Sequence, residues 1–416
     1  MSKWIQYTTF HKNIIEAMLQ CDEKDTAERL VEFIKTKNEK ISYDQEEEKY
    51  YINSFYPTIP SSAWNRLVNG VSAIVNEEKR VPLQADIVVT GKCHCHCWHC
   101  FRSKYTEEDM SLATIQECME SLYQLGTATV GITGGEPMLR SDILDILNAI
   151  PDGLEGQLYT TGYRMDEEFA RKIKKTNVTR CIISLDHYDE EVVCQLRHNS
   201  NAFQEALKAI QVLTKHKMYT AVTVCITDAL LELDELKRYF EFIQELGVSE
   251  IRVVMPIPQG RLEGRNVGRI YGEAMKLIKK FRKEYAKKEG VPTIVNFCEL
   301  ESPAYFGCGA GANYISINNN GLITPCVAVP LSFGSIYKEP LEKIYHNMKE
   351  YFIESSQVCY GIASGRIISK EKVDVTNPPI SVEVSKRIAE QCKLATGRAA
   401  LFQYCKNDKE KINQSI

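Results

Sequence analysis

The sequence lacks several features that would place it in a special class of proteins. It contains no run of about 18 apolar residues, so no segment is expected to span a membrane. Its first residues, MSKWIQYTTFHKN, have no apolar core of a secretory signal. An excess of basic residues is also missing, because 51 Lys and Arg stand against 55 Asp and Glu. We therefore expect a cytoplasmic protein that does not bind nucleic acid through bulk positive charge.

Disulfide pairing is not expected, although the chain contains 15 cysteines. Their number is odd, the chain is long and a secretory signal is missing, so reduced thiols and metal ligands are the better interpretation. Several scattered cysteines fall within predicted helices or strands, where a thiol acts as a small buried apolar group. These are Cys21, Cys118, Cys181 and Cys194.

From about residue 84 the chain alternates short β-rich apolar runs with helical segments of ten residues or more. Such alternation predicts right-handed βαβ units around a parallel sheet. Six pairs are too few for a closed eight-stranded barrel, so we expect an α/β fold with a partial (β/α)6 TIM-like barrel over 84–295. Function is then expected on the loops after the strands. The predicted strands are 84–90, 128–133, 156–160, 180–186, 219–227 and 250–257.

The two ends of the chain differ from this barrel. Residues 1–80 are predicted to form a mostly helical extension, with apolar residues at helical spacing over 13–37 and 61–75. An acidic, tyrosine-rich segment between them either packs against the barrel or lines a substrate entrance. Residues 296–416 are predicted to form a small α+β domain that contains a hairpin with turn residues at 319–321.

The stretch GKCHCHCWHCFRSKY follows the first barrel strand and holds four cysteines and three histidines in eight positions. Cys93, Cys97 and Cys100 have the spacing CxxxCxxC. Three thiolates suit a [4Fe–4S] cluster that leaves one iron without a protein ligand. Structural zinc normally has four ligands in paired CxxC knuckles. The additional Cys95 and the histidines keep zinc open on this fragment alone.

This stretch, together with the strand ends that follow, resembles the radical S-adenosylmethionine (radical SAM) superfamily. That family places CxxxCxxC after the first strand of a partial six-fold barrel, and TGGEP at the end of the second strand here resembles its GGE motif. The match runs from about residue 85 to 260 and in weaker form to 360. It implies a [4Fe–4S] cluster on Cys93, Cys97 and Cys100, with Cys95 as a spectator.

The resemblance also implies residues that hold S-adenosylmethionine at the ends of the second and third strands. Glu136, together with the backbone of Gly134 and Gly135, would hold the amino group of the cofactor. The third strand ends in YTTG, which matches a polar strand end in the family, so Thr161 is expected near the cofactor.

Further contacts are implied beyond the fourth strand, which ends in SLD. Ser184 and Asp186 match residues that usually contact the ribose or the methionyl end. Arg197 matches an arginine that pairs with the cofactor carboxylate. Local capping or a surface ion pair is the alternative for Ser184 and Arg197.

The implied chemistry is that of the cofactors. An electron from the reduced cluster cleaves S-adenosylmethionine to methionine and a 5′-deoxyadenosyl radical, which abstracts a hydrogen atom from the substrate. An electron donor such as flavodoxin or ferredoxin is implied as a partner. The resemblance names no catalytic side chain of the protein itself.

A second set of cysteines resembles the opening of the SPASM and twitch domains, C-x(9–15)-G-x4-C, through Cys308, Gly321 and Cys326. Cys359 stands where the family has a C-x2-C pair, but its partner is missing. One auxiliary [4Fe–4S] cluster on Cys308, Cys326 and Cys359 is therefore implied, and a degenerate domain with free thiols is the alternative. The fourth ligand is left open among Cys298, Cys392 and Cys405.

SPASM and twitch relatives mostly modify ribosomal peptides or proteins by crosslinking, epimerisation or dehydrogenation, and others act on small alcohols or lipid-like molecules. Residues 1–80 show no leader-peptide recognition module, which is typically a small winged helix with a three-stranded sheet. We still expect a peptide-modifying or protein-modifying maturase. The alternatives are a radical SAM oxidoreductase or methyltransferase of small-molecule or lipid biosynthesis and, remotely, a non-catalytic zinc-binding protein.

Overall fold

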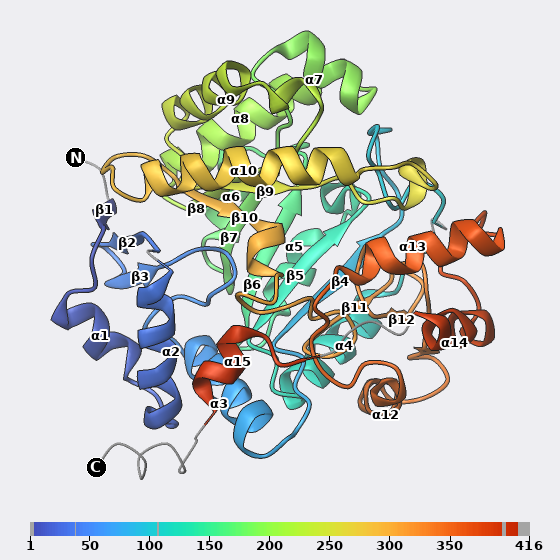
Figure 1. The fold of residues 1–416 in the computed structure, drawn as a ribbon. Helices are drawn as coiled ribbons and strands as arrows, with labels where there is room; N and C mark the ends of the chain where they lie inside the picture. The colour runs from blue at the N-terminus through green and yellow to red at the C-terminus, as the bar shows by residue number, and fades with distance from the viewer. Residues whose placement is uncertain (1–3, 38, 106–107, 393–396, 407–416) are drawn as a thin grey trace.

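The computed structural model describes residues 4–37, 39–105, 108–392 and 397–406. Within this part of the chain, ten strands form one sheet in the order β10-β9-β8-β7-β6-β5-β4-β11-β12-β13 (Figure 1). The six predicted strands are β4 to β9, and neighbouring strands among them are parallel, which confirms the α/β fold. Their bounds are β4 Gln84–Thr90, β5 Thr129–Gly134, β6 Glu155–Thr160, β7 Val178–Ser184, β8 Tyr219–Cys225 and β9 Glu250–Val254.

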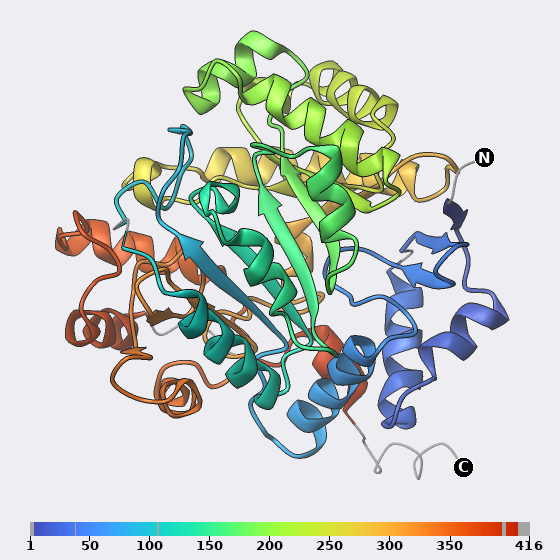
Figure 2. The same ribbon diagram turned by 180° about the vertical axis from the view of Figure 1, so that it is seen from behind.

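Helices return the chain between these strands and lie over the outside of the sheet, as Figure 2 shows from behind. Their apolar faces and the strands share one core, because the buried residues recur at helical spacing on each of them. None of the described helices is both long and apolar enough to cross a membrane. The helices are α4 Leu112–Gln124, α5 Ile143–Asn148, α6 Glu167–Ile173, α7 Glu190–Arg197, α8 Ala202–Lys215, α9 Leu233–Glu245 and α10 Gly268–Tyr285, with 3₁₀ turns η1 Pro137–Leu139, η2 Ala229–Leu231 and η3 Gly260–Leu262.

Two further parallel strands extend the predicted barrel at its edges. β10 (Thr293–Asn296) pairs with β9, and β11 (Tyr314–Ile317) pairs with β4. Because these edge strands do not pair with each other, the barrel stays open, as predicted. Each has four residues, which is too short for a periodic pattern to show in the sequence.

The C-terminal region is joined to the barrel through β11 rather than set apart from it. The predicted hairpin is present: β11 pairs with β12 (Leu322–Thr324), and β12 pairs with β13 (Gly334–Ser335). The last helix leaves this region and packs beside α2 and α3 of the N-terminal region (Figure 1). The helices are α11 Phe297–Leu300, α12 Leu341–Asn347, η4 Met348–Glu350, α13 Tyr360–Glu371, α14 Val382–Gln391 and α15 Ala400–Cys405.

The N-terminal region is mostly helical, as expected, and it also contains a sheet that the sequence analysis did not predict. Besides α1 (Lys12–Met18), α2 (Lys24–Thr36) and α3 (Ser62–Asn76), it contains a three-stranded antiparallel sheet. The strands are β1 Trp4–Tyr7, β2 Ile41–Asp44 and β3 Lys49–Tyr51. Strands of three or four residues give no readable alternation, and the acidic turn between β2 and β3 hides them further.

The tyrosine-rich segment after β3 packs against the N-terminal ends of the barrel strands, as one of the two expectations had it. Ser54 donates its backbone N–H (2.8 Å) and its hydroxyl (2.5 Å) to the Glu250 carboxylate at the start of β9. Thr58 donates its N–H to Glu155 at the start of β6 (3.0 Å). The guanidinium of Arg180, paired with Glu155, donates to the Tyr56 carbonyl (2.5 Å). These buried contacts close the end of the barrel opposite the cysteine loop.

Candidate cluster and cofactor site

The cysteine loop begins where β4 ends and is fixed by backbone hydrogen bonds to distant elements. His96 donates its N–H to the carbonyl of Arg197, the last residue of α7 (2.8 Å). Arg261 of η3 donates its N–H to the Cys100 carbonyl (3.1 Å). Gly260 has a φ of 58°, and a Cβ there would lie 2.4 Å from the same carbonyl oxygen. These contacts hold the loop in one conformation.

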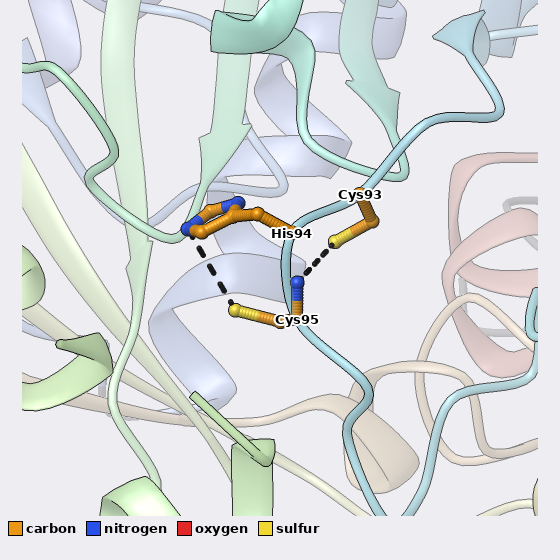
Figure 3. A group of neighbouring side chains, drawn as sticks. All are labelled: Cys93, His94 and Cys95. Carbon is orange, nitrogen blue, oxygen red and sulfur yellow. Dashed lines mark hydrogen bonds between the residues drawn. The ribbon is translucent and has the colours of Figure 1, made fainter. Parts of the chain in front are cut away.

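Figure 3 shows Cys93, His94 and Cys95, whose ligand atoms lie within 4.8 Å of one another. Cys95 is only 7% exposed, and Asn199 donates its side-chain N–H to the Cys95 sulfur (3.4 Å). A buried, hydrogen-bonded thiol suits a packing role, but its position beside Cys93 also makes Cys93–His94–Cys95 a competing ligand trio.

The predicted ligands Cys93, Cys97 and Cys100 are all partly exposed. Hydrogen bonding to Cys95 and burial raise the pKa of Cys97, and burial raises the pKa of Cys100. A cationic metal centre would offset this cost by binding the thiolates. The donor set therefore fits an iron–sulfur cluster, with the free cysteine left inside the loop.

Asp186 and Arg197 form a buried ion pair next to the cysteine loop, with 2.6 Å between Asp186 Oδ2 and Arg197 Nη2. Asp186 Oδ1 accepts the backbone N–H of Cys225 at the end of β8 (3.0 Å). Arg197 Nη1 lies 3.8 Å from the Cys97 sulfur. Arg197 is thus not part of a surface ion pair, and its Nε is buried without a hydrogen-bond partner among the residues described. Ser184 ends β7 and is half-buried.

The Glu136 carboxylate connects the end of β5 to the end of β6. It is fully buried, and its Oε1 accepts the N–H of Met138 (3.0 Å) and the hydroxyl of Thr160 (2.6 Å). Its Oε2 accepts the N–H and the hydroxyl of Thr161 (both 2.7 Å). Glu136 and Thr161 are therefore hydrogen-bonded to each other, and the Glu136 carboxylate braces the GGE turn against the end of β6.

The GGE turn touches the start of the cysteine loop directly. Gly135 donates its N–H to the Thr90 carbonyl, and Glu136 donates its N–H to the Lys92 carbonyl (both 2.8 Å). A Cβ at Gly135 would lie 2.2 Å from the Lys92 carbonyl oxygen. Only glycine permits this approach. The GGE turn, which begins with Gly134 at the end of β5, and the cysteine loop are thus in direct contact.

The members of the second cysteine set lie near Cys308. Cys308 and Cys359 are hydrogen-bonded to each other, and Tyr360 donates its N–H to the Cys308 sulfur (3.5 Å). Cys326 follows β12, and its thiol is close enough to Cys308 for a Coulombic interaction between the two. Cys298 lies in the short α11 after β10, and it also has a Coulombic interaction with Cys308. Cys298, Cys326 and Cys359 are therefore all neighbours of Cys308.

The other two candidates for a fourth ligand lie elsewhere. Cys392 neighbours Tyr360, and Cys405 lies on α15 in the N-terminal core. The partly buried Glu301 carboxyl, by contrast, neighbours Cys298, Cys308 and Cys326, and desolvation raises its pKa. Sequence spacing could not identify Cys298, because it precedes the SPASM-like pattern and belongs to the last turn of the barrel.

The inside of the barrel carries polar residues that the sequence analysis missed. Arg252 on β9 is 4% exposed, donates to the Tyr159 hydroxyl (3.1 Å) and has a buried Nε without a partner among the residues described. Asp86 on β4 accepts the Tyr314 hydroxyl (2.5 Å), and burial raises its pKa to about 6. The signal available in the sequence was a charged residue within an apolar strand, which is Asp86 in QADIVVT and Arg252 in EIRVVMPI.

Comparison with known families agrees with this geometry. Residues 87–243 match the model of the radical SAM superfamily, and residues 308–359 match the SPASM iron–sulfur cluster-binding domain. The chain belongs to the radical SAM superfamily. A radical SAM enzyme with a SPASM domain uses [4Fe–4S] clusters and S-adenosylmethionine, so the expected cofactors are confirmed. The non-catalytic zinc-binding alternative is excluded.

Several characterised radical SAM proteins are similar to the chain. The AdoMet-dependent heme synthase of Methanosarcina barkeri is 25% identical over 288 residues, which are 63% of this chain and 82% of the relative. The subtilosin biosynthesis protein AlbA of Bacillus subtilis is 22% identical over 357 residues, which are 82% and 77%. The structure of Streptococcus suis SuiB bound to its precursor peptide SuiA has a TM-score of 0.55 at 16% identity and covers 68% of this chain and 69% of SuiB. The last likeness shows the fold alone.

We predict that Cys93→Ala, Cys97→Ala or Cys100→Ala removes the first cluster, whereas Cys95→Ala retains it, because three thiolates share that cluster. The measurement is iron per protein after anaerobic reconstitution, in a Cys308→Ala/Cys326→Ala background that removes auxiliary iron. If Cys95→Ala loses the iron and Cys97→Ala keeps it, the ligands are the trio in Figure 3 instead.

We predict that Glu136→Gln lowers both the thermal stability of the cofactor-free protein and its affinity for S-adenosylmethionine. The amide nitrogen cannot accept from Thr161 or Thr160, and each unsatisfied buried donor costs about 1–3 kcal/mol. The Tm should fall by several degrees, and the affinity roughly ten- to a hundredfold. Glu168→Gln is the control, since Glu168 is exposed on α6. A lower affinity with an unchanged Tm would show that the carboxylate contacts the cofactor instead of bracing the turn.

We predict that Cys298 is the fourth ligand of the auxiliary cluster. In a variant with Cys93, Cys97 and Cys100 replaced by Ala, about four irons should remain. Adding Cys298→Ala should lower that iron content or change its electron paramagnetic resonance signal, whereas Cys392→Ala and Cys405→Ala should not. Loss of iron with Cys392→Ala would refute the assignment, and an iron-free triple variant would show that the SPASM-like domain is degenerate.

Proposed function

We propose that the chain modifies a peptide or protein by radical chemistry, through crosslinking, epimerisation or dehydrogenation. The observation that carries the substrate class is the N-terminal three-stranded sheet with α1 and α2, because a three-stranded sheet with helices is what a leader-peptide module requires. An edge strand such as β1 can pair with an extended peptide. The similarity to AlbA, named for subtilosin biosynthesis, over 82% of the chain supports the same class.

The cofactor end of the barrel is assigned to the cysteine loop and to two groups that contact it, the GGE turn and Arg197 with its partner Asp186. Cys93, Cys97 and Cys100 bind the first cluster, and the braced GGE turn and the Asp186–Arg197 pair bind S-adenosylmethionine. When bound, these groups supply a 5′-deoxyadenosyl radical that abstracts a hydrogen atom from the substrate. Arg197 Nε, buried and unpaired within the described structure, is the donor left for the cofactor carboxylate.

The substrate is proposed to enter from the loops that follow the strands. The opposite end of the barrel is closed by the contacts of Ser54 and Thr58 with Glu250 and Glu155. The reacting residue would then contact the polar inner wall. There Arg252 offers an unpaired Nε to a carbonyl or carboxylate of the substrate.

The auxiliary site suits an oxidative outcome. A reaction that removes two hydrogens leaves one electron to be accepted after the first hydrogen atom has been abstracted. Cys298, Cys308, Cys326 and Cys359 are proposed to hold the group that accepts it, because thiolate-ligated clusters cover a wide range of potentials. The chemistry needs a donor such as flavodoxin or ferredoxin and a reducing compartment, for which we propose the cytoplasm.

A second candidate is a reaction on a small molecule, and the similarity to heme synthases at 25% identity over 288 residues favours it. In that case the interior arginine would bind a carboxylate of the small molecule.

In the test, the short peptides encoded beside the gene are incubated with the reconstituted enzyme, S-adenosylmethionine and dithionite. We expect one peptide to lose two mass units on crosslinking or dehydrogenation, or, on epimerisation, to keep its mass in H2O and gain about one unit in D2O. The matched control is Cys100→Ala, which should leave the peptide unchanged. A gain of 14 units would indicate a methyltransferase. Turnover of a carboxylated tetrapyrrole, with every peptide unchanged, would establish the second candidate.

A further inference from the structure

A groove of about 890 Å³ lies on the surface next to the end of the cysteine loop. We call it the basic groove and define it by Trp98, Lys104, His198, Arg261, Arg265 and Lys372, which are among its lining residues. Trp98 and Lys104 belong to the cysteine loop, and His198 follows α7. Arg261 and Arg265 precede α10, and Lys372 ends α13.

The groove is positively charged in a chain of net charge −4. Lys104 is paired with Glu263 at 3.0 Å. Arg261, Arg265 and Lys372 are exposed and form no ion pair within the described residues, although many other exposed lysines and arginines of the chain do. Three uncompensated positive charges around one hollow favour a negatively charged partner.

A residue of the groove wall is hydrogen-bonded through its backbone to a predicted cluster ligand. Arg261 donates its N–H to the Cys100 carbonyl at 3.1 Å, and its guanidinium is an electrostatic neighbour of the Cys100 sulfur. Trp98 stands between Cys97 and Cys100 in the sequence. The GGE turn, by contrast, meets the other end of the loop at Lys92. The groove and the cofactor motif therefore approach the cysteines from opposite ends of one loop.

We propose that the basic groove is the docking surface for an acidic one-electron carrier protein. The inference rests on the proposed function only in assuming a cluster on Cys93, Cys97 and Cys100. With a flavin carrier, the hydroquinone gives up one electron and becomes the semiquinone. A [4Fe–4S] cluster held by Cys93, Cys97 and Cys100 would take up that electron and pass from the 2+ to the 1+ state. Charge complementarity argues for a carrier, because carriers that must associate and separate quickly use electrostatic steering more than buried area.

The other basic cavity of the described chain does not fit this role. It is lined by Lys79, Arg80, Lys343 and Lys349, but Lys79 pairs with Glu77 and Lys343 pairs with Glu339. Its lining contains no residue of the cysteine loop. Lys349 of that cavity therefore offers a control position.

The experiment compares Arg265→Glu/Lys372→Glu with the matched control Lys280→Glu/Lys349→Glu, which changes the net charge equally outside the groove. Purified flavodoxin is the probe. Its Kd is measured by titration, and cluster reduction by its hydroquinone is followed by stopped-flow absorbance at low salt. We expect the groove variant to weaken binding and slow reduction by about 10- to 100-fold, and the control to change either by less than about 3-fold. High salt should remove the difference.

Dithionite separates docking from folding and from the proposed function, because it needs no docking surface. The groove variant should keep the wild-type Tm, dithionite reduction and dithionite-driven cleavage of S-adenosylmethionine. Arg265→Gln/Lys372→Gln should give an intermediate effect. Equal flavodoxin binding by the groove variant and the control would overturn the proposal. So would a groove variant that binds flavodoxin normally but loses affinity for the peptide substrate. A failure of the peptide assay leaves these measurements unaffected.

Discussion

The contact between the GGE turn and the start of the cysteine loop is the interaction on which the rest of the site depends. Two backbone hydrogen bonds of 2.8 Å join Gly135 and Glu136 to Thr90 and Lys92, and the missing Cβ at Gly135 allows them. The Glu136 carboxylate then fixes this turn to the end of β6. One end of the cysteine loop is thus positioned by the GGE turn itself, so the proposed cluster ligands and the proposed contacts with S-adenosylmethionine belong to one local geometry.

The two ends of the barrel differ in how their buried charged groups are paired. At the closed end, Glu155, Arg180 and Glu250 are buried and each is hydrogen-bonded to the segment after β3, although Arg180 Nε has no partner among the described residues. Removing one partner of such a buried ion pair costs about 3–5 kcal/mol, because the other charge stays buried. Arg197 Nε, beside the cysteine loop, and Arg252 Nε, on the inner wall of the barrel, are also without partners among the described residues. Of these donors, Arg197 Nε lies where a ligand of the first site is expected.

The sequence allowed the parts of the fold with long periodic patterns to be predicted. Strands β4 to β9 alternate with helices, so their order and their parallel pairing followed from periodicity and chain connectivity. β10, β11 and the N-terminal sheet have three or four residues per strand, and such short strands carry no pattern. The cysteines and the GGE motif were recognisable because their spacing is local. The bracing role of Glu136 and the location of Cys298 depend on contacts between distant segments, which no local spacing encodes.

The continuous sheet makes the SPASM domain part of the first site as well as the second. β11 pairs with β4, the strand that leads into the cysteine loop, and the turn after β11 contacts that loop. Arg102, just beyond Cys100, donates to the side chains of Asn318 and Asn319 (2.8 and 2.9 Å). Tyr314 on β11 reaches Asp86 inside the barrel. A displacement of the hairpin would therefore move the first cluster loop and the inner wall together. The relative position of the two predicted cysteine sites is consequently set by sheet hydrogen bonds rather than by a flexible linker.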